Sequence, residues 1–205
     1  MPYKIIGIHG HARSGKDTVA KYLAKHTGNL AISDFTDRPY FIIPFAESLK
    51  NCAHGIFGVS LYEEVDKEKI IPEWGISQRI ILQTLGVSLR ETFGENIFIN
   101  SLIHKINTRL RLSFCSAPGA SRSQIYIIIP DVRFQNELDW IYSQGGTILH
   151  IKRPGADGNV GIPQHISEAN LTLKGEHTYV ILNDGSLEDL EKEVTCVFKQ
   201  FIASK

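Results

Sequence analysis

The stretch Gly10-His11-Ala12-Arg13-Ser14-Gly15-Lys16-Asp17-Thr18 decides the fold of this chain. It follows an apolar run at 3–8 with the profile of a buried strand, and it opens a segment at 16–26 whose apolar residues recur at helical spacing. Two glycines separated by four residues and followed by lysine, between a strand and a helix, indicate a phosphate-binding loop, or P-loop. Its backbone N–H groups and helix N-terminus suit a phosphate, and Lys16 adds a positive charge for the β- and γ-phosphates.

The residue after the loop lysine departs from the general motif. Asp17 stands where Ser or Thr normally contacts magnesium, and Thr18 is its neighbour. An aspartate can hold the ion directly or through water, and the sequence leaves both arrangements open. The loop therefore predicts ATP and Mg²⁺ as cofactors, bound by residues of this stretch: Gly10, Ser14, Gly15, Lys16, Asp17 and Thr18.

Short apolar runs alternate with amphipathic segments along the rest of the chain. Strands are expected at 40–43, 125–129, 147–151 and 179–182, and the isoleucine-rich run at 125–129 is typical of a central parallel strand. Helices are expected at 45–57, 77–93, 95–111 and 133–144, with a last one capped by Ser186. Segments 113–124 and 153–164 should be irregular. This alternation predicts one α/β layered domain over 1–205 with a mainly parallel sheet.

Composition narrows the class of protein. The 205 residues are 42% hydrophobic and carry 22 basic and 22 acidic side chains, so no basic surplus points to a nucleic-acid backbone. Three scattered cysteines are expected to be reduced, and no zinc-ligand spacing joins them to the eight histidines. No apolar run is long enough to span a bilayer, and no signal-peptide layout is present. We expect a cytoplasmic protein with a small-molecule substrate and no stable nucleic-acid or membrane partner.

Several further segments, in order, resemble the phage deoxynucleoside monophosphate kinases of the P-loop superfamily. The Ser-Gly-Lys-Asp-Thr form of the loop is shared with them, and phosphomevalonate kinases have a related loop. The other segments are Pro44-Phe45-Ala46-Glu47-Ser48-Leu49-Lys50, Pro72-Glu73-Trp74-Gly75-Ile76-Ser77-Gln78-Arg79, Leu82-Gln83-Thr84-Leu85-Gly86, Asp131-Val132-Arg133-Phe134-Gln135-Asn136-Glu137, His165-Ile166-Ser167-Glu168 and Asn183-Asp184-Gly185-Ser186-Leu187-Glu188. The resemblance implies a three-layer kinase fold with a five-stranded parallel sheet, a helical acceptor-binding insertion at about 45–112 and a short lid at about 153–168.

The acceptor is expected to bind one face of the helix at 77–93. Arg79, Gln83, Gly86 and Arg90 share that face because they are spaced by four, three and four, while Ile81, Leu85 and Leu89 should pack in the core. An arginine can hold a phosphate in bidentate fashion, a glutamine can read a base, and a glycine leaves room. The alternative is a solvated polar stripe. The resemblance adds Lys50 and Trp74 to the substrate-binding residues.

Besides Lys16, four residues are expected to assist phosphoryl transfer: Arg13, Asp131, Arg133 and Arg153. Asp131 follows the apolar strand, where a carboxylate beside a P-loop commonly positions magnesium; the alternative is an N-cap for the helix at 133–144. The three arginines can neutralise the transferring phosphoryl group, and the alternative for each is an ordinary surface position.

The lid and the last turn carry weaker expectations. A lid can exclude water that competes as acceptor, although a plain surface loop is the alternative. In related kinases the turn after the last strand borders the adenine base, which would involve Asn183 and Gly185; by composition it is a strand-to-helix turn. His165 and Glu168 match a family motif without an assigned chemical role.

Three functions are compatible with this sequence. The leading hypothesis is an ATP-dependent kinase that converts a deoxynucleoside monophosphate (dNMP) to its diphosphate (dNDP), a phosphotransferase with a phosphate acceptor. The second is a P-loop kinase for phosphomevalonate or for a hydroxymethylated base in DNA, the latter disfavoured by the balanced charge. The third is a non-catalytic ATP-binding switch, disfavoured by the acceptor region at 74–90. Base preference, ribose rejection and subunit number, including a homodimer, stay open, and a phage-encoded protein would act in the host cytoplasm.

Overall fold

A five-stranded parallel sheet forms the centre of the molecule. The computed structural model describes residues 3–27, 40–61, 68–116, 124–155 and 171–203. The strands are β1 (Tyr3–His9), β2 (Tyr40–Ile42), β5 (Ile125–Val132), β6 (Thr147–Lys152) and β7 (Thr178–Leu182). Their order is β2-β5-β1-β6-β7, and every neighbouring pair is parallel. The prediction of a five-stranded parallel sheet is confirmed.

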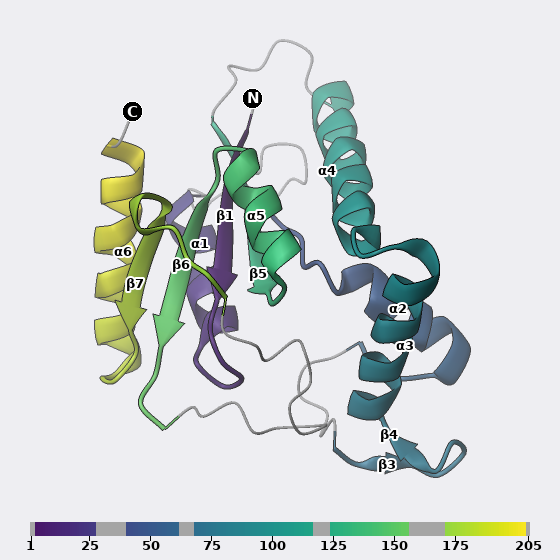
Figure 1. The fold of residues 1–205 in the computed structure, drawn as a ribbon. Helices are drawn as coiled ribbons and strands as arrows, with labels where there is room; N and C mark the ends of the chain where they lie inside the picture. The colour runs from purple at the N-terminus through teal and green to yellow at the C-terminus, as the bar shows by residue number, and fades with distance from the viewer. Residues whose placement is uncertain (1–2, 28–39, 62–67, 117–123, 156–170, 204–205) are drawn as a thin grey trace.

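Helices cover both faces of this sheet and make a three-layer α/β fold (Figure 1). On one face, α1 (Lys16–Thr27) and α6 (Leu187–Ala203) bury Val19, Leu23 and Val194 against apolar residues of β1 and β5. On the other face, α4 (Ile97–Ser116) and α5 (Gln135–Ser143) enclose a second core cluster. Because both faces are covered, β5 can place Ile127, Ile128 and Ile129 side by side in the core, all of them fully buried.

The segment between β2 and β5 builds a separate helical lobe beside the sheet (Figure 1). It contains α2 (Glu47–Phe57), a short hairpin of β3 (Ile70–Ile71) and β4 (Ile76–Ser77), and α3 (Gln78–Phe93). Ser77 caps α3, since its Oγ accepts the Ile80 N–H at 3.4 Å. The hairpin was not predicted, because two residues per strand show no periodicity.

Two helix boundaries differ from the predictions. The helix expected at 133–144 begins only at Gln135, since the N–H groups of Arg133 and Phe134 donate to the Glu137 carboxylate. Helix α4 continues to Ser116, so the predicted loop at 113–124 was wrong over its first four residues, and 117–123 lie outside the described residues. The Ser186 cap is confirmed by the Asp189 N–H, which donates to Ser186 Oγ at 3.2 Å.

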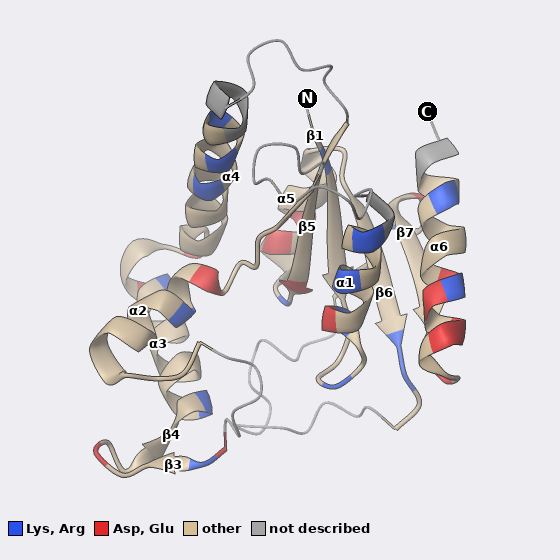
Figure 2. Cartoon of the chain, turned by 180° about the vertical axis from the view of Figure 1, so that it is seen from behind, with Lys and Arg blue, Asp and Glu red and all other residues tan. Residues whose placement is uncertain are grey.

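The carboxyl ends of all five strands meet at one edge of the sheet, where α/β proteins bind ligands. The glycine loop follows β1 at this edge, and Figure 2 shows basic residues both in that loop and at the end of β6. Among the helices of the described ranges, none has the length and apolar character that a membrane span requires.

Candidate active site

The phosphate loop joins β1 to α1 as the sequence predicted, and two of its glycines are required by their surroundings. A Cβ on Gly10 would lie 2.6 Å from the Ile151 carbonyl oxygen, and Gly15 has a φ of 98°. Arg13 adopts a left-handed φ of 62°, which is uncommon for a residue with a side chain. Lys16 Nζ donates to the carbonyl oxygens of Gly10 at 2.7 Å and His11 at 2.6 Å. The ammonium charge therefore lies directly over the loop.

Side chains from the neighbouring strand ends contact the loop carbonyls. Arg153, just beyond β6, donates from Nη1 to the Arg13 carbonyl oxygen at 3.3 Å, so these two arginines lie at one edge. Asn183, just beyond β7, donates from Nδ2 to the Ser14 carbonyl oxygen at 2.8 Å. Ser14 itself is 1% exposed, and its buried Oγ has no hydrogen-bond partner within the described residues. An unpaired buried hydroxyl is uncommon, and this one lies at the turn of the loop beside Gly10.

Asp131, the penultimate residue of β5, binds the start of α2. Its two carboxylate oxygens accept the N–H groups of Phe45 at 2.8 Å and Ala46 at 2.9 Å. Burial raises the pKa of the Asp131 carboxyl, against the lowering effects of these two N–H donors and of the Arg133 and Lys50 charges. The alternative that Asp131 caps the helix after it was wrong, because Phe134 is the N-cap of α5 and the Asp131 carboxylate binds the turn before α2 instead.

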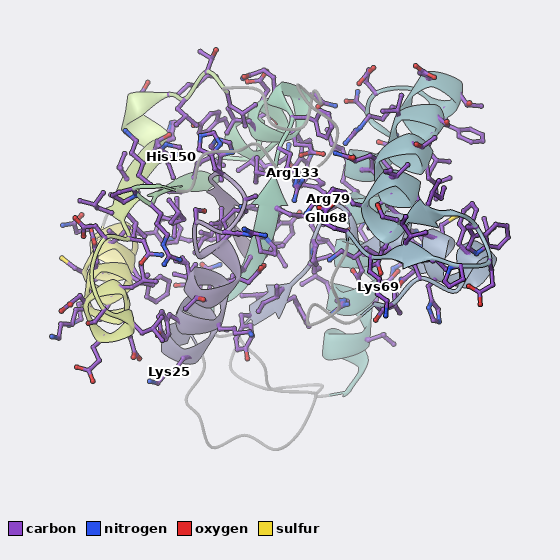
Figure 3. The ribbon with its side chains drawn as sticks, turned by 90° about the horizontal axis from the view of Figure 1, so that it is seen from below. Lys25, Glu68, Lys69, Arg79, Arg133 and His150 are labelled. Carbon is purple, nitrogen blue, oxygen red and sulfur yellow. The ribbon has the colours of Figure 1, made fainter. Side chains whose placement is uncertain are left out.

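The structure brings Arg133 and Lys50 towards the same edge, since both charges act on Asp131. Arg133 is exposed in the turn between β5 and α5, and Lys50 is half-buried on α2. Figure 3 shows Arg133 in a view onto this edge of the sheet. Four segments distant in the chain thus supply cations at this edge: the glycine loop, α2, the β5–α5 turn and the residue after β6.

Arg90 lies in a buried ion pair instead of on an open polar stripe. Its Nη2 is 3.0 Å from Glu137 Oε1, and the two side chains are 10% and 2% exposed. The guanidinium stacks over the rings of Phe134, 3.8 Å from the centroid, and Phe98, at 4.5 Å. Burial raises the pKa of Glu137 to about 7, although N–H donation by Arg133 and the charge of Arg90 both lower it. Arg90 therefore joins α3 to the start of α5.

The other members of the predicted α3 stripe have different surroundings. Arg79 pairs with Glu68, before the hairpin, as Figure 3 shows, and Gln83 is half-buried. Gly86 is buried, and a Cβ there would lie 3.3 Å from Leu49 Cδ2 of α2. Close packing of α2 on α3 accounts for this glycine without a ligand. The opposite face packs inwards as expected, with Ile81, Leu85 and Leu89 in or against core clusters.

The remaining predicted site residues lie in the hairpin, in the first turn of α1 and after β7, or outside the described residues. Trp74, in the hairpin turn, is 47% exposed, and its Nε1 donates to the Phe57 carbonyl oxygen at 3.0 Å. Asp17 is exposed and Thr18 half-buried in the first turn of α1. A Cβ on Gly185, in the turn after β7, would lie 3.1 Å from Asp189 Oδ2. His165, Glu168 and most of the predicted lid at 153–168 lie outside the described residues.

A stacked histidine pair beside the loop was missed by the sequence reasoning. The rings of His9, the last residue of β1, and His150 of β6 are 5.1 Å apart and 16° from parallel. Burial, followed by the charges of His9, Lys152 and His11, lowers the pKa of His150 to about 4. His9 ends the apolar run of β1 and His150 interrupts that of β6, and their proximity follows only once β1 and β6 are known to be neighbours.

This geometry defines a three-layer P-loop kinase fold, and comparison with known proteins names the family. The family model for deoxynucleotide monophosphate kinase matches residues 48–194. A putative deoxynucleotide monophosphate kinase of Acanthamoeba polyphaga mimivirus is 30% identical over 203 residues, 94% of this chain and 95% of that protein. Deoxynucleotide monophosphate kinases of Enterobacteria phage T4 and Escherichia phage RB69 are 39% and 32% identical over 74 residues, 36% of this chain and 29% of each relative. The chain belongs to the deoxynucleotide monophosphate kinase family, a family of phosphotransferases.

Proposed function

We propose that this chain transfers the γ-phosphate of ATP to a deoxynucleoside 5′-monophosphate, with Mg²⁺ as the metal. The observation that carries the proposal is Lys16, whose ammonium lies over a glycine loop at the carboxyl edge of a parallel sheet. The three relatives support this acceptor, since they are named deoxynucleotide monophosphate kinases, one of them as putative. The whole chain then acts as one domain, with the acceptor-binding insertion at 45–112 and the lid at 153–168.

The reaction needs charge neutralisation more than proton transfer. An oxygen of the acceptor phosphate attacks the γ-phosphorus while the bond to the β–γ bridging oxygen breaks, which releases ADP and the dNDP. The acceptor oxygen is already ionised near neutral pH, so no general base is required. Lys16 and the loop N–H groups hold the β- and γ-phosphates, and Arg13, Arg133 and Arg153 neutralise the group in transfer.

The oxygen donors near the loop fit a magnesium ion. Asp17 is exposed directly after Lys16, and each carboxylate oxygen of Asp131 retains a second acceptor site beside its N–H bond. Magnesium commonly takes one or two carboxylates and completes its shell with waters and substrate phosphates. Such a magnesium site does not require a cluster of three His, Cys, Asp or Glu side chains, and the described residues contain no such cluster. Asp17 and Asp131 are the proposed ligands, and the bound ion would neutralise phosphate charge.

The acceptor is proposed to lie between the insertion and the sheet edge. Lys50 and Arg79 are the cations proposed for its 5′-phosphate, because Lys50 acts on Asp131 and the partly buried Arg79 lies at the start of α3. Gln83 and Trp74 are proposed to contact the base. Arg90 and Gly86 are proposed to support this region from behind, because one is committed to Glu137 and the other packs on Leu49. We propose that the reaction takes place in the cytoplasm.

Substitution of Lys16 tests this proposal. Lys16→Ala should lower the rate of dNDP formation by orders of magnitude, because the lysine neutralises the phosphates that carry the transferred group. Lys21→Ala is the matched control, since Lys21 is an exposed lysine on the same helix. Both variants should unfold at the wild-type urea midpoint. A folded Lys16→Ala variant with near-normal turnover would remove the basis of the proposal.

A further inference from the structure

The Asn183 side chain contacts the phosphate loop at a peptide whose orientation matters. Its Nδ2 donates to the Ser14 carbonyl oxygen at 2.8 Å, across 169 positions of the chain. The same nitrogen would lie 2.6 Å from a Cβ on Gly15, so it reaches the loop only because residue 15 is glycine. The contact therefore depends on the amide donor of Asn183 and on the absence of a side chain at Gly15, two residues far apart in the sequence.

Asn183 is fixed in place by the sheet. Its backbone N–H donates to the Lys152 carbonyl oxygen at 2.7 Å, which extends the pairing of β6 with β7 by one residue. The residue is half-buried, so its amide group has little conformational freedom to lose when it binds the loop. A rigid donor of this kind can hold the loop in one conformation.

The peptide geometry turns this contact into control of a phosphate-binding group. A trans peptide is planar, and its C=O and N–H bonds point in opposite directions. A bond that fixes the Ser14 carbonyl on the Asn183 side therefore directs the Gly15 N–H to the other side. Gly15 immediately precedes α1, so its N–H is at the helix end, where backbone donors lack partners within the helix and bind anions.

We propose that Asn183 is a positioning residue for the donor phosphates, which holds the Ser14–Gly15 peptide so that the Gly15 N–H faces the bound phosphate. This inference rests on the proposed function, because it requires the loop to bind the phosphates of ATP. It differs from a contact of Asn183 with the adenine base. A residue that acts through the loop affects any polyphosphate, whereas a residue that reads the base affects only the nucleotide.

The test measures the Kd of ATP and of inorganic tripolyphosphate for the full-length chain and its variants. Asn183→Leu keeps the approximate shape without the donor, and Asn183→Ala is the second variant if the first unfolds. Either variant should raise the Kd of ATP and the Kd of tripolyphosphate by the same factor, about two- to tenfold for the loss of one neutral hydrogen bond. The KM for dNMP should not change. Asn136→Leu is the matched control, since Asn136 also donates from Nδ2 to a loop carbonyl, that of Glu95 at 2.9 Å, but on the acceptor side.

Each outcome separates the inference from the function on which it rests. Equal losses for ATP and tripolyphosphate, absent in Asn136→Leu, would support the positioning role. A higher Kd for ATP with an unchanged Kd for tripolyphosphate would overturn the positioning role and indicate that Asn183 contacts the adenine base. Wild-type affinity for both ligands in a folded Asn183 variant would overturn it as well. If the wild-type chain binds neither ligand, the proposed function itself fails, and the inference fails with it.

Discussion

Removal of Arg90 should destabilise the protein in a pH-dependent way. Arg90→Ala leaves the Glu137 carboxylate, 2% exposed, without its partner at 3.0 Å, and loss of one member of a buried pair typically costs about 3–5 kcal/mol. The carboxyl can partly escape this cost by binding a proton, because its pKa is already raised to about 7. Without Arg90 that pKa should rise further. We therefore expect a loss of about 3 kcal/mol at pH 8.5 and one smaller by about 1–2 kcal/mol at pH 6, since each pKa unit is worth about 1.4 kcal/mol.

The sign follows from proton binding. Between the unfolded pKa of 4.5 and the folded value of about 7, the folded state holds a proton that the unfolded state has released, so stability falls as pH rises. In Arg90→Ala the free energy of unfolding should keep falling to higher pH, because the pKa of Glu137 is higher in that variant. Urea unfolding at pH 6 and pH 8.5 measures it, with the m-value as a check on two-state behaviour.

Two variants control this measurement. Arg90→Ala combined with Glu137→Gln removes the buried charge and should recover part of the stability at pH 8.5. Lys25→Ala breaks the exposed Lys25–Glu191 pair and should have a much smaller effect at both pH values. An Arg90→Ala variant with the wild-type urea midpoint at both pH values would refute the reasoning. If that stable variant also had a KM for dNMP raised more than tenfold, Arg90 would be a phosphate ligand of the acceptor.

Three further predictions follow from single contacts. Asp131→Asn leaves one side-chain oxygen for the two N–H groups at the start of α2, so the free energy of unfolding should fall by about 1–2 kcal/mol; unchanged stability in urea would contradict those bonds, and a shifted Mg²⁺ dependence of the rate would support the metal role. Burial lowers the pKa of His150 to about 4, so as the pH falls the unfolded state binds a proton at this residue before the folded state does, and Tm should fall between pH 6.5 and pH 4. The dependence of Tm on pH should be weaker in His150→Phe. Equal dependence in the wild type and the variant would contradict the lowered pKa. Gly86→Ala should leave the KM for dNMP unchanged, because the glycine faces Leu49; a raised KM in a stable variant would return it to the substrate site.

Local signals in the sequence predicted the sheet and the loop. The glycine and lysine spacing occupies only the seven residues Gly10 to Lys16, and the isoleucines of β5 indicate burial on both faces without any knowledge of topology. Helix α3 was predicted at 77–93 and runs from Gln78 to Phe93, because its apolar face repeats over four turns and Ser77 caps it. Such patterns are set by the nearest residues in the chain, so they can be read from one sequence.

The contacts that organise the site could not be read in this way. Arg90 and Glu137 are 47 positions apart, Asp131 and Phe45 are 86 apart, and their pairing depends on which segments the sheet order brings together. The helical pattern of α3 placed Arg90 on a polar face, and it contains no information about the carboxylate and the two aromatic rings that surround the guanidinium. The capping alternative for Asp131 pointed to the following helix, because proximity in sequence is the only guide before β5 and the turn preceding α2 are known to meet.

Transfer of label from ATP tests the central claim most directly. The wild-type chain would be incubated with γ-labelled ATP, Mg²⁺ and each of the four common dNMPs in turn, with phosphomevalonate and DNA containing hydroxymethylated bases as alternative acceptors. We expect the label to appear in the β-phosphate of at least one dNDP, with one ADP formed for each dNDP, and to require Lys16. Label transferred only to another acceptor, or no transfer to any acceptor by a chain that binds ATP, would contradict the account.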